Sequence, residues 1–166
     1  MVAGVGPIIV GTDFSEGSAA ALVEGRLLAA RLGAAVEVVH VVDGVQRPGW
    51  RPGGEADGWL RAAGLSPDDL RIRFGSPWVE LARLTDDRAA LLLAVGSHGV
   101  SGYQPLAIGS TASRVSMSAR CPVVVVSPQV RSRESEVRGS REVAAPAGAA
   151  GARSEPGDHQ RLRETR

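Results

Sequence analysis

Three glycines in the second half of the chain carry the clearest chemical signal, because their spacing can build a binding site for an anion. Two residues separate Gly96 from Gly99, nine separate Gly99 from Gly109, and Ser110 and Thr111 follow directly. Glycine has no Cβ, so it permits positive φ angles and lets backbone N–H groups converge on a phosphate oxygen. A helix that begins at Ser110 adds free N–H groups, a partial positive charge and hydroxyl donors. The pattern predicts a site that binds a polyphosphate from two sides.

Three other polar side chains are candidates for such a site. Asp13 follows a strand-like run and is placed to accept a ribose hydroxyl, yet an aspartate there is also a common helix-initiating residue. His98 lies inside the glycine loop, but no second acid or base is beside it in the sequence, which favours a positioning role over catalysis. His40, flanked by valines, is more typical of a core histidine bonded to backbone than of a ligand. No catalytic residue is predicted.

The residues around these candidates predict alternating strands and helices. Short β-branched runs predict strands at Pro7–Gly11, Val36–Val42, Leu70–Phe74, Leu91–Val95 and Val123–Val126. Capping signals and helical spacing predict helices from Ser15 to Gly33, over Glu55–Ala63, from Ser76-Pro77 onward and over Ser110–Ser118. This order predicts an α/β fold, a doubly wound five-stranded parallel sheet with helices on both faces. Ligands of such sheets bind at the carboxyl ends of the strands, where the winding reverses.

The helical spacing also predicts which side chains face the core. In the first helix these are Ala19, Leu22, Val23, Leu27 and Ala30. In the helix after Ser76 they are Trp78, Leu81 and Ala82.

Length and composition limit the domain organisation. A chain of 166 residues fits one domain of roughly 100–200 residues, and the periodic part ends near residue 128. We therefore expect an α/β domain over 1–128. Residues 129–166 are rich in Arg, Glu, Ser, Ala and Gly and are predicted to be a disordered charged tail, either simply solvated or a weak binding arm.

Composition also excludes several function classes. The formal net charge of +1 gives no electrostatic reason to expect a nucleic acid as partner. The longest apolar runs, such as Ala89–Val95, are far shorter than the about 20 residues of a membrane span, and no secretory signal is evident, so a cytoplasmic location is expected. The single cysteine, Cys121, cannot form an intramolecular disulfide, and the absence of lysine excludes a Walker-type phosphate lysine.

The glycine pattern resembles the phosphate-binding signature of the ATP-binding universal stress proteins and matches it without insertion or deletion. The resemblance extends to Ile8–Ser15 as the first strand and acidic turn, Val38–Asp43 as the second strand, and Cys121–Val126 as the closing strand. It covers roughly residues 5–128 and implies the Rossmann-like, adenine nucleotide alpha hydrolase-like fold.

The resemblance also implies roles for individual residues. Asp13, with Thr12 beside it, would face the ribose or adenine of ATP, and Val41 would read the adenine edge with its backbone. The glycine loop, with His98 inside it, would hold the phosphates, with or without Mg²⁺. A homodimer through Val123–Val126 is implied as well, and an apolar edge strand left unpaired would be an aggregation hazard.

Three functions stay open. The leading expectation is a stress-related regulator that binds ATP and hydrolyses it slowly at most. An ATP-consuming enzyme is disfavoured, because metal-assisted phosphoryl transfer needs several carboxylates and a charge clamp, whereas Asp13 is the only carboxylate expected near the phosphates. A nucleotide-independent dimeric interaction module is the other alternative, since some universal stress proteins lack the glycine signature.

Overall fold

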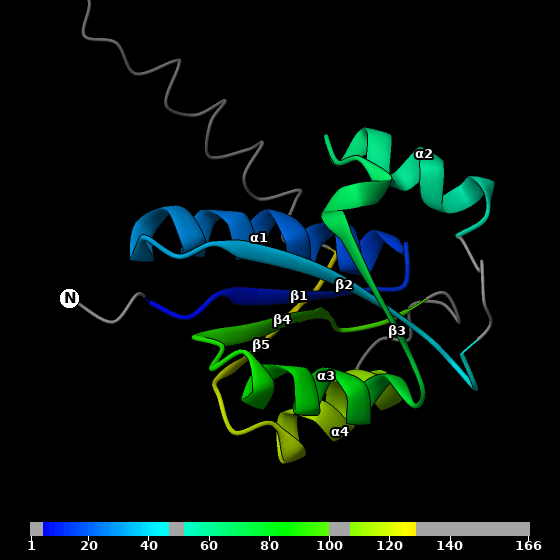
Figure 1. Ribbon diagram of the computed structural model, residues 1–166. Helices are drawn as coiled ribbons and strands as arrows, with labels where there is room; N and C mark the ends of the chain where they lie inside the picture. Colours follow the sequence, from blue (N-terminus) through cyan, green and yellow to red (C-terminus); the bar gives the residue numbers. More distant parts are fainter. Residues whose placement is uncertain (1–4, 47–51, 100–106, 129–166) are drawn as a thin grey trace, which may run out of the picture.

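Strands and helices alternate along the chain in the computed structural model, which describes residues 5–46, 52–99 and 107–128 (Figure 1). The strands are β1 (Ile8–Thr12), β2 (Val36–Val42), β3 (Leu70–Phe74), β4 (Leu92–Gly96) and β5 (Val123–Val126). The helices are α1 (Glu16–Leu32), α2 (Gly54–Ala62), α3 (Pro77–Asp87) and α4 (Ser110–Ser118), with a 3-10 turn at Pro67–Asp69. The bounds of β2, β3, β5 and α4 agree with those predicted from the sequence.

The five strands form one parallel sheet in the order β3-β2-β1-β4-β5. The chain winds from β1 toward β3 and then crosses to β4 on the other side of β1, so the winding reverses between β1 and β4. Helices α1 and α2 cover one face of the sheet, and α3 and α4 cover the other (Figure 1). The predicted doubly wound fold is confirmed.

Helix ends follow the predicted capping signals in two cases. Ser15 caps α1 by accepting a hydrogen bond from the backbone N–H of Ser18 at 3.2 Å. Gly33 ends the same helix with a φ of 65°, in the left-handed region that favours glycine. Helix α3 begins at Pro77 after Ser76 as expected, although the Ser76 side chain makes no capping hydrogen bond.

The predicted buried face of α1 is largely wrong. Of the five residues expected to face inward, only Leu22 is buried, and Ala30 is exposed. The residues that are buried are mostly small: Gly17, Ser18, Ala20, Ala21, Leu22, Gly25 and Ala29. A Cβ at Gly25 would lie 2.7 Å from Cγ2 of Val10 in β1. The helix therefore approaches the sheet closely along small residues and Leu22, and its other large apolar side chains are only partly buried or exposed.

His40 is bonded to backbone, as the sequence predicts. Its Nδ1 lies 2.8 Å from the carbonyl oxygen of Thr12, and its ring centroid is 4.4 Å from that of Phe14. Trp59 of α2 packs edge-on against Phe14 and donates from its indole nitrogen to the Ser15 carbonyl at 3.3 Å. These contacts anchor α2 to the turn between β1 and α1.

The two edges of the sheet differ in chemistry. Edge strand β3 carries Arg71 and Arg73, which form ion pairs with Glu37 at 3.3 Å and Glu80 at 3.4 Å. Strand β5 is the opposite edge, as predicted, and consists of four valines of which only Val126 is fully buried. The predicted tail, 129–166, lies outside the described residues. Within the described ranges, every helix is too short or too polar to span a bilayer.

Candidate functional site

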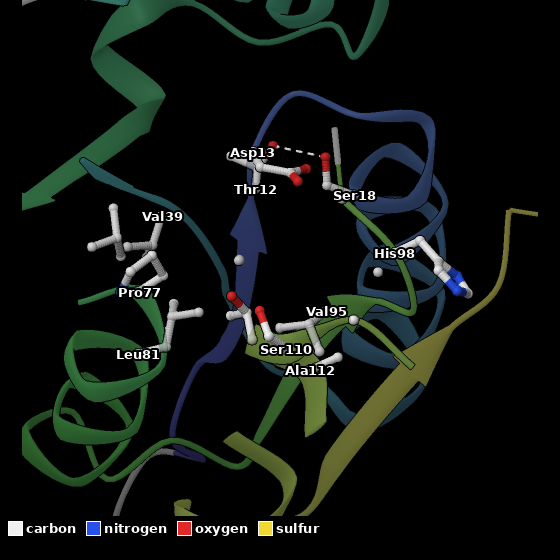
Figure 2. Close-up of a pocket in the computed structure, with 16 residues that line it drawn as sticks. Thr12, Asp13, Ser18, Val39, Pro77, Leu81, Val95, His98, Ser110 and Ala112 are labelled. Carbon is white, nitrogen blue, oxygen red and sulfur yellow. Dashed lines mark hydrogen bonds between the residues drawn. The ribbon is translucent and has the colours of Figure 1, made fainter. Parts of the chain in front are cut away.

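A cavity of about 210 Å³ opens at the carboxyl ends of β1, β2 and β4, where the winding of the sheet reverses (Figure 2). This is the position at which open α/β sheets bind ligands. All nine residues singled out from the sequence line this one cavity: Thr12, Asp13, Val41, Gly96, His98, Gly99, Gly109, Ser110 and Thr111. Residues that are far apart in the sequence, such as Thr12 and Thr111, thus line the same cavity.

The end of β1 supplies a hydrogen-bonded polar wall. The hydroxyls of Thr12 and Ser18 lie 3.0 Å apart, and the Phe14 N–H donates to the Thr12 hydroxyl at 3.0 Å (Figure 2). One carboxylate oxygen of Asp13, Oδ1, accepts from the N–H of Ser15 at 3.1 Å and from its hydroxyl at 2.5 Å. Asp13 therefore has the helix-initiating role in the turn into α1, and it also lines the cavity.

The three signature glycines allow close packing of backbone segments. A Cβ at Gly96 would lie 2.6 Å from the Gly17 carbonyl carbon and 2.9 Å from the Ser18 nitrogen, both in the first turn of α1. A Cβ at Gly99 would run into the Asp13 carboxylate, and one at Gly109 would lie 3.2 Å from the Ser97 carbonyl oxygen.

The expectation that the signature uses glycine for positive φ angles is therefore wrong. Among the described glycines, positive φ angles occur at Gly33, Gly44, Gly64 and Gly75 and not in the signature. Gly109 has a φ of −58°, which any residue adopts. What the signature positions require is room for neighbouring atoms rather than an unusual backbone conformation.

The start of α4 faces the same cavity from the other side. The Gly109 N–H donates to the Ser97 carbonyl at 2.7 Å, which ties the approach to α4 to the end of β4. The first intrahelical hydrogen bond runs from Ser113 to Gly109. The N–H groups of Ser110, Thr111 and Ala112 precede that bond, so they are the orphan donors of a helix N-terminus, and all three residues line the cavity.

The remaining walls are apolar. Val39 and Val41 of β2 and Val95 of β4 line the cavity with Pro77 and Leu81 of α3. In Figure 2, Val39 lies on the same side as Pro77 and Leu81, and Val95 lies near Ala112. Val41 lies one residue beyond Thr12↔His40, the last paired position of β1 with β2. Its backbone is thus the part of β2 that extends past β1 into the site.

Sequence reasoning missed Ser18, Pro77 and Leu81 as cavity residues. Leu81 was predicted only as a core residue, and it does pack there with Val95 while also closing the cavity. Ser18 carried no signal beyond its place in the first turn of α1. His98 does line the cavity, but its ring points away from the side chains of Thr12, Asp13 and Ser110 in Figure 2, and its Nδ1 lies 2.9 Å from the Ser97 hydroxyl.

The charges near the site are sparse. Asp13 is the one acidic side chain among the described lining residues, and no arginine is among them. Arg71 and Arg88 pair instead with Glu37 in β2, and the carboxylate of Glu37 raises the pKa of Arg88. Residues 5–46, 52–99 and 107–128 contain no group of three His, Cys, Asp or Glu side chains that could hold a metal. A divalent ion here would take most of its ligands from a bound phosphate and from water, with Asp13 as the available carboxylate.

Comparison with known proteins agrees on one family. Residues 4–127 match the family model described as the universal stress protein family. A universal stress protein of Mycolicibacterium smegmatis is 32% identical over 137 residues, which cover 74% of this chain and 46% of that protein. The chain spans about half or less of the length of the curated relatives that it matches.

Two solved structures are similar over most of this chain. A universal stress protein in complex with cAMP is 25% identical, with a TM-score of 0.53 over 75% of this chain and 98% of that chain. The universal stress protein UspA from Lactobacillus plantarum is 26% identical, with a TM-score of 0.58 over 75% of this chain and 99% of that chain.

Proposed function

Because the chain belongs to the universal stress protein family, we propose that it binds ATP in the cavity between β1 and β4 and acts as a stress-related, nucleotide-dependent regulator. The observation that carries this proposal is the convergence of both halves of the glycine signature, Asp13 and Val41 on one cavity. The cAMP complex of a neighbouring family member supports an adenine nucleotide as the ligand class.

The walls of the cavity suit the three parts of the nucleotide. The adenine base would lie against the apolar wall of Pro77 and Leu81, with its polar edge on the backbone of Val41. The ribose would lie near Thr12 and Asp13. The cavity is smaller than the roughly 300–1,000 Å³ of drug-sized ligand pockets, so the terminal phosphates would extend beyond it.

The phosphates would meet neutral donors. The N–H groups and hydroxyls of Ser110 and Thr111 at the start of α4 would face them, opposite the backbone of Gly96 and Gly99. Efficient hydrolysis needs a base and a charge clamp at the reacting phosphate, and the His98 ring points away from the cavity in Figure 2. We therefore propose that nucleotide is held and sensed, with slow hydrolysis at most.

Base selectivity tests this proposal in the unmodified protein. Calorimetric titration of nucleotide-stripped protein with ATP in the presence of Mg²⁺ should give micromolar binding. GTP should bind at least about tenfold more weakly, because the donors and acceptors on the edge of guanine are reversed relative to those of adenine. The backbone N–H and C=O groups of Val41 would then be left without hydrogen-bond partners. Equal binding of both nucleotides would contradict the assigned base site, and binding of neither would favour the interaction-module alternative.

Dimerisation is a separate part of the proposal, with β5 as the contact. Val123 to Val125 lie on an edge strand and are only partly buried, so pairing with a second copy would complete their burial. Val125→Asp should convert the dimer to monomers or aggregates in light scattering, since it places a charge in that contact. Val45→Asp alters an exposed valine away from β5 and should leave the dimer intact. A Val125→Asp protein that stays dimeric would refute the β5 interface.

A further inference from the structure

Phe14 has a strained backbone in the turn that leads from β1 into α1. Its φ is 66°, in the left-handed region that bulky residues rarely adopt. Among the described residues other than glycine, Ala89 alone shares a positive φ, and it follows the end of α3, where left-handed residues are common. Phe14 instead precedes a helix. A bulky residue keeps such a conformation only where its surroundings impose it.

Aromatic side chains from β2 and α2 surround Phe14. Its ring centroid lies 4.4 Å from that of His40 in β2 and 5.8 Å from that of Trp59 in α2. The same two side chains reach the backbone on either side of Phe14. Nδ1 of His40 lies 2.8 Å from the Thr12 carbonyl oxygen, and the Trp59 indole N–H donates to the Ser15 carbonyl at 3.3 Å. The turn is therefore held at both of its ends by side chains that lie outside the nucleotide cavity.

The opposite side of this turn is a wall of the proposed nucleotide site. Thr12 and Asp13 line the cavity there. The N–H of Ser15 donates to Oδ1 of Asp13 at 3.1 Å. This N–H points at Asp13 only while Phe14 keeps its backbone angles, because those angles set the direction of the peptide that follows it. A change in the conformation of Phe14 would therefore change how the turn presents Asp13 to the cavity.

We infer that Trp59 is a positioning residue for the nucleotide site and that it acts through Phe14. Docking of α2 places Trp59 against Phe14, keeps the turn in its left-handed conformation and so presents the cavity-lining residues of the turn to a nucleotide. Linkage requires the converse, so a bound nucleotide stabilises the docking of α2. The inference rests on the proposed nucleotide-binding function and deepens it, because it makes α2 the element whose docking depends on occupancy of the site.

Calorimetric titration of nucleotide-stripped protein with ATP and Mg²⁺ tests the role of Trp59. Trp59→Ala should weaken ATP binding by roughly fivefold or more. Trp59→Phe keeps an aromatic ring beside Phe14 and should recover most of the affinity. Arg61→Ala shortens an exposed side chain in the same helix and should bind as the wild type does. Wild-type affinity in Trp59→Ala would overturn the inference.

Exchanges at Phe14 separate this coupling from a general loss of stability. Glycine adopts a positive φ readily, whereas alanine does so at a cost. Phe14→Ala should therefore bind ATP roughly threefold or more weakly than Phe14→Gly. In the Phe14→Gly background, Trp59→Ala should lose most of its effect on the affinity, because the ring contact through which it acts is gone. An undiminished effect of Trp59→Ala in that background would overturn the role of Phe14.

Hydrogen exchange tests the converse effect of the nucleotide on α2. Saturating ATP should slow the exchange of the α2 amides in the wild type, and this protection should be lost in Trp59→Ala. Amides of β1 and β4 should stay protected in both proteins, which shows that the sheet is folded. ATP binding without added protection of α2 would overturn the coupling and leave nucleotide binding intact. Absence of ATP binding by the wild type would defeat the proposed function, and this inference with it.

Discussion

Replacement of Gly96 by alanine should destabilise the protein by about 3 kcal/mol. The new Cβ would lie 2.6 Å from the Gly17 carbonyl carbon and 2.9 Å from both the Gly17 oxygen and the Ser18 nitrogen. These are backbone atoms of the first turn of α1, so no side-chain rotation can relieve the contact. The helix would have to move away from β4, which would open the core beneath Ala21 and Leu22.

Urea denaturation followed by circular dichroism measures this effect as a shift of the midpoint at constant slope. Gly58→Ala is the matched control, because Gly58 lies within α2 and an added Cβ there would have no neighbour within 4 Å. Alanine is the better helix former by about 0.5–1 kcal/mol, so this control should be slightly more stable than the wild type. A Gly96→Ala protein as stable as the wild type would show that Gly96 is not required for packing.

Simultaneous replacement of Gly109 and Ser110 by alanine should weaken ATP binding by at least about tenfold while the fold is retained. Gly109 has a φ of −58°, so alanine fits its backbone, and the added Cβ would lie 3.2 Å from the Ser97 oxygen, a contact that a small shift can relieve. Ser110 is exposed at the first position of α4. The double variant removes one hydroxyl donor and narrows the space in front of the helix N-terminus, which is where a phosphate would lie.

One prediction is a loss of stability and the other a loss of ATP binding, because the glycines of the signature have different roles. Gly96 permits contact between β4 and α1, and Gly109 lies where the chain enters α4 beside the cavity. A loss of binding in a Gly96 variant would therefore not identify the phosphate site, whereas a loss in the Gly109 and Ser110 variant would.

Much of the fold could be predicted because the local signals are unambiguous. Valine-rich runs indicated β2 and β5, the second of which lies between Pro122 and Pro128, and Ser15 and Gly33 marked both ends of α1. The buried face of α1 could not be predicted, because hydrophobic periodicity gives weight to large side chains. The closeness of this helix to the sheet depends instead on its small residues, such as Gly25.

The residues of the candidate site that directly follow a strand could be predicted from the sequence. The residues that reach the cavity only through tertiary packing could not. Asp13 and the glycine loop follow from the rule that the carboxyl ends of parallel strands meet at one edge. Val41 was indicated only by the resemblance to the universal stress proteins. Pro77 and Leu81 reach the cavity only because α3 packs across β2, which no local pattern in the sequence specifies.

Calorimetric titration with ATP and Mg²⁺ of three nucleotide-stripped proteins tests the central claim most directly. These are the wild type, the Gly109→Ala/Ser110→Ala variant, and a control that carries Gly58→Ala and Ser113→Ala, the same two exchanges away from the cavity lining. Micromolar binding by the wild type and the control, with at least about a tenfold loss in the site variant, supports nucleotide binding between β1 and β4. Equal affinity in all three proteins would show that ATP binds elsewhere, and absence of binding in all three would contradict the nucleotide-binding role of this chain.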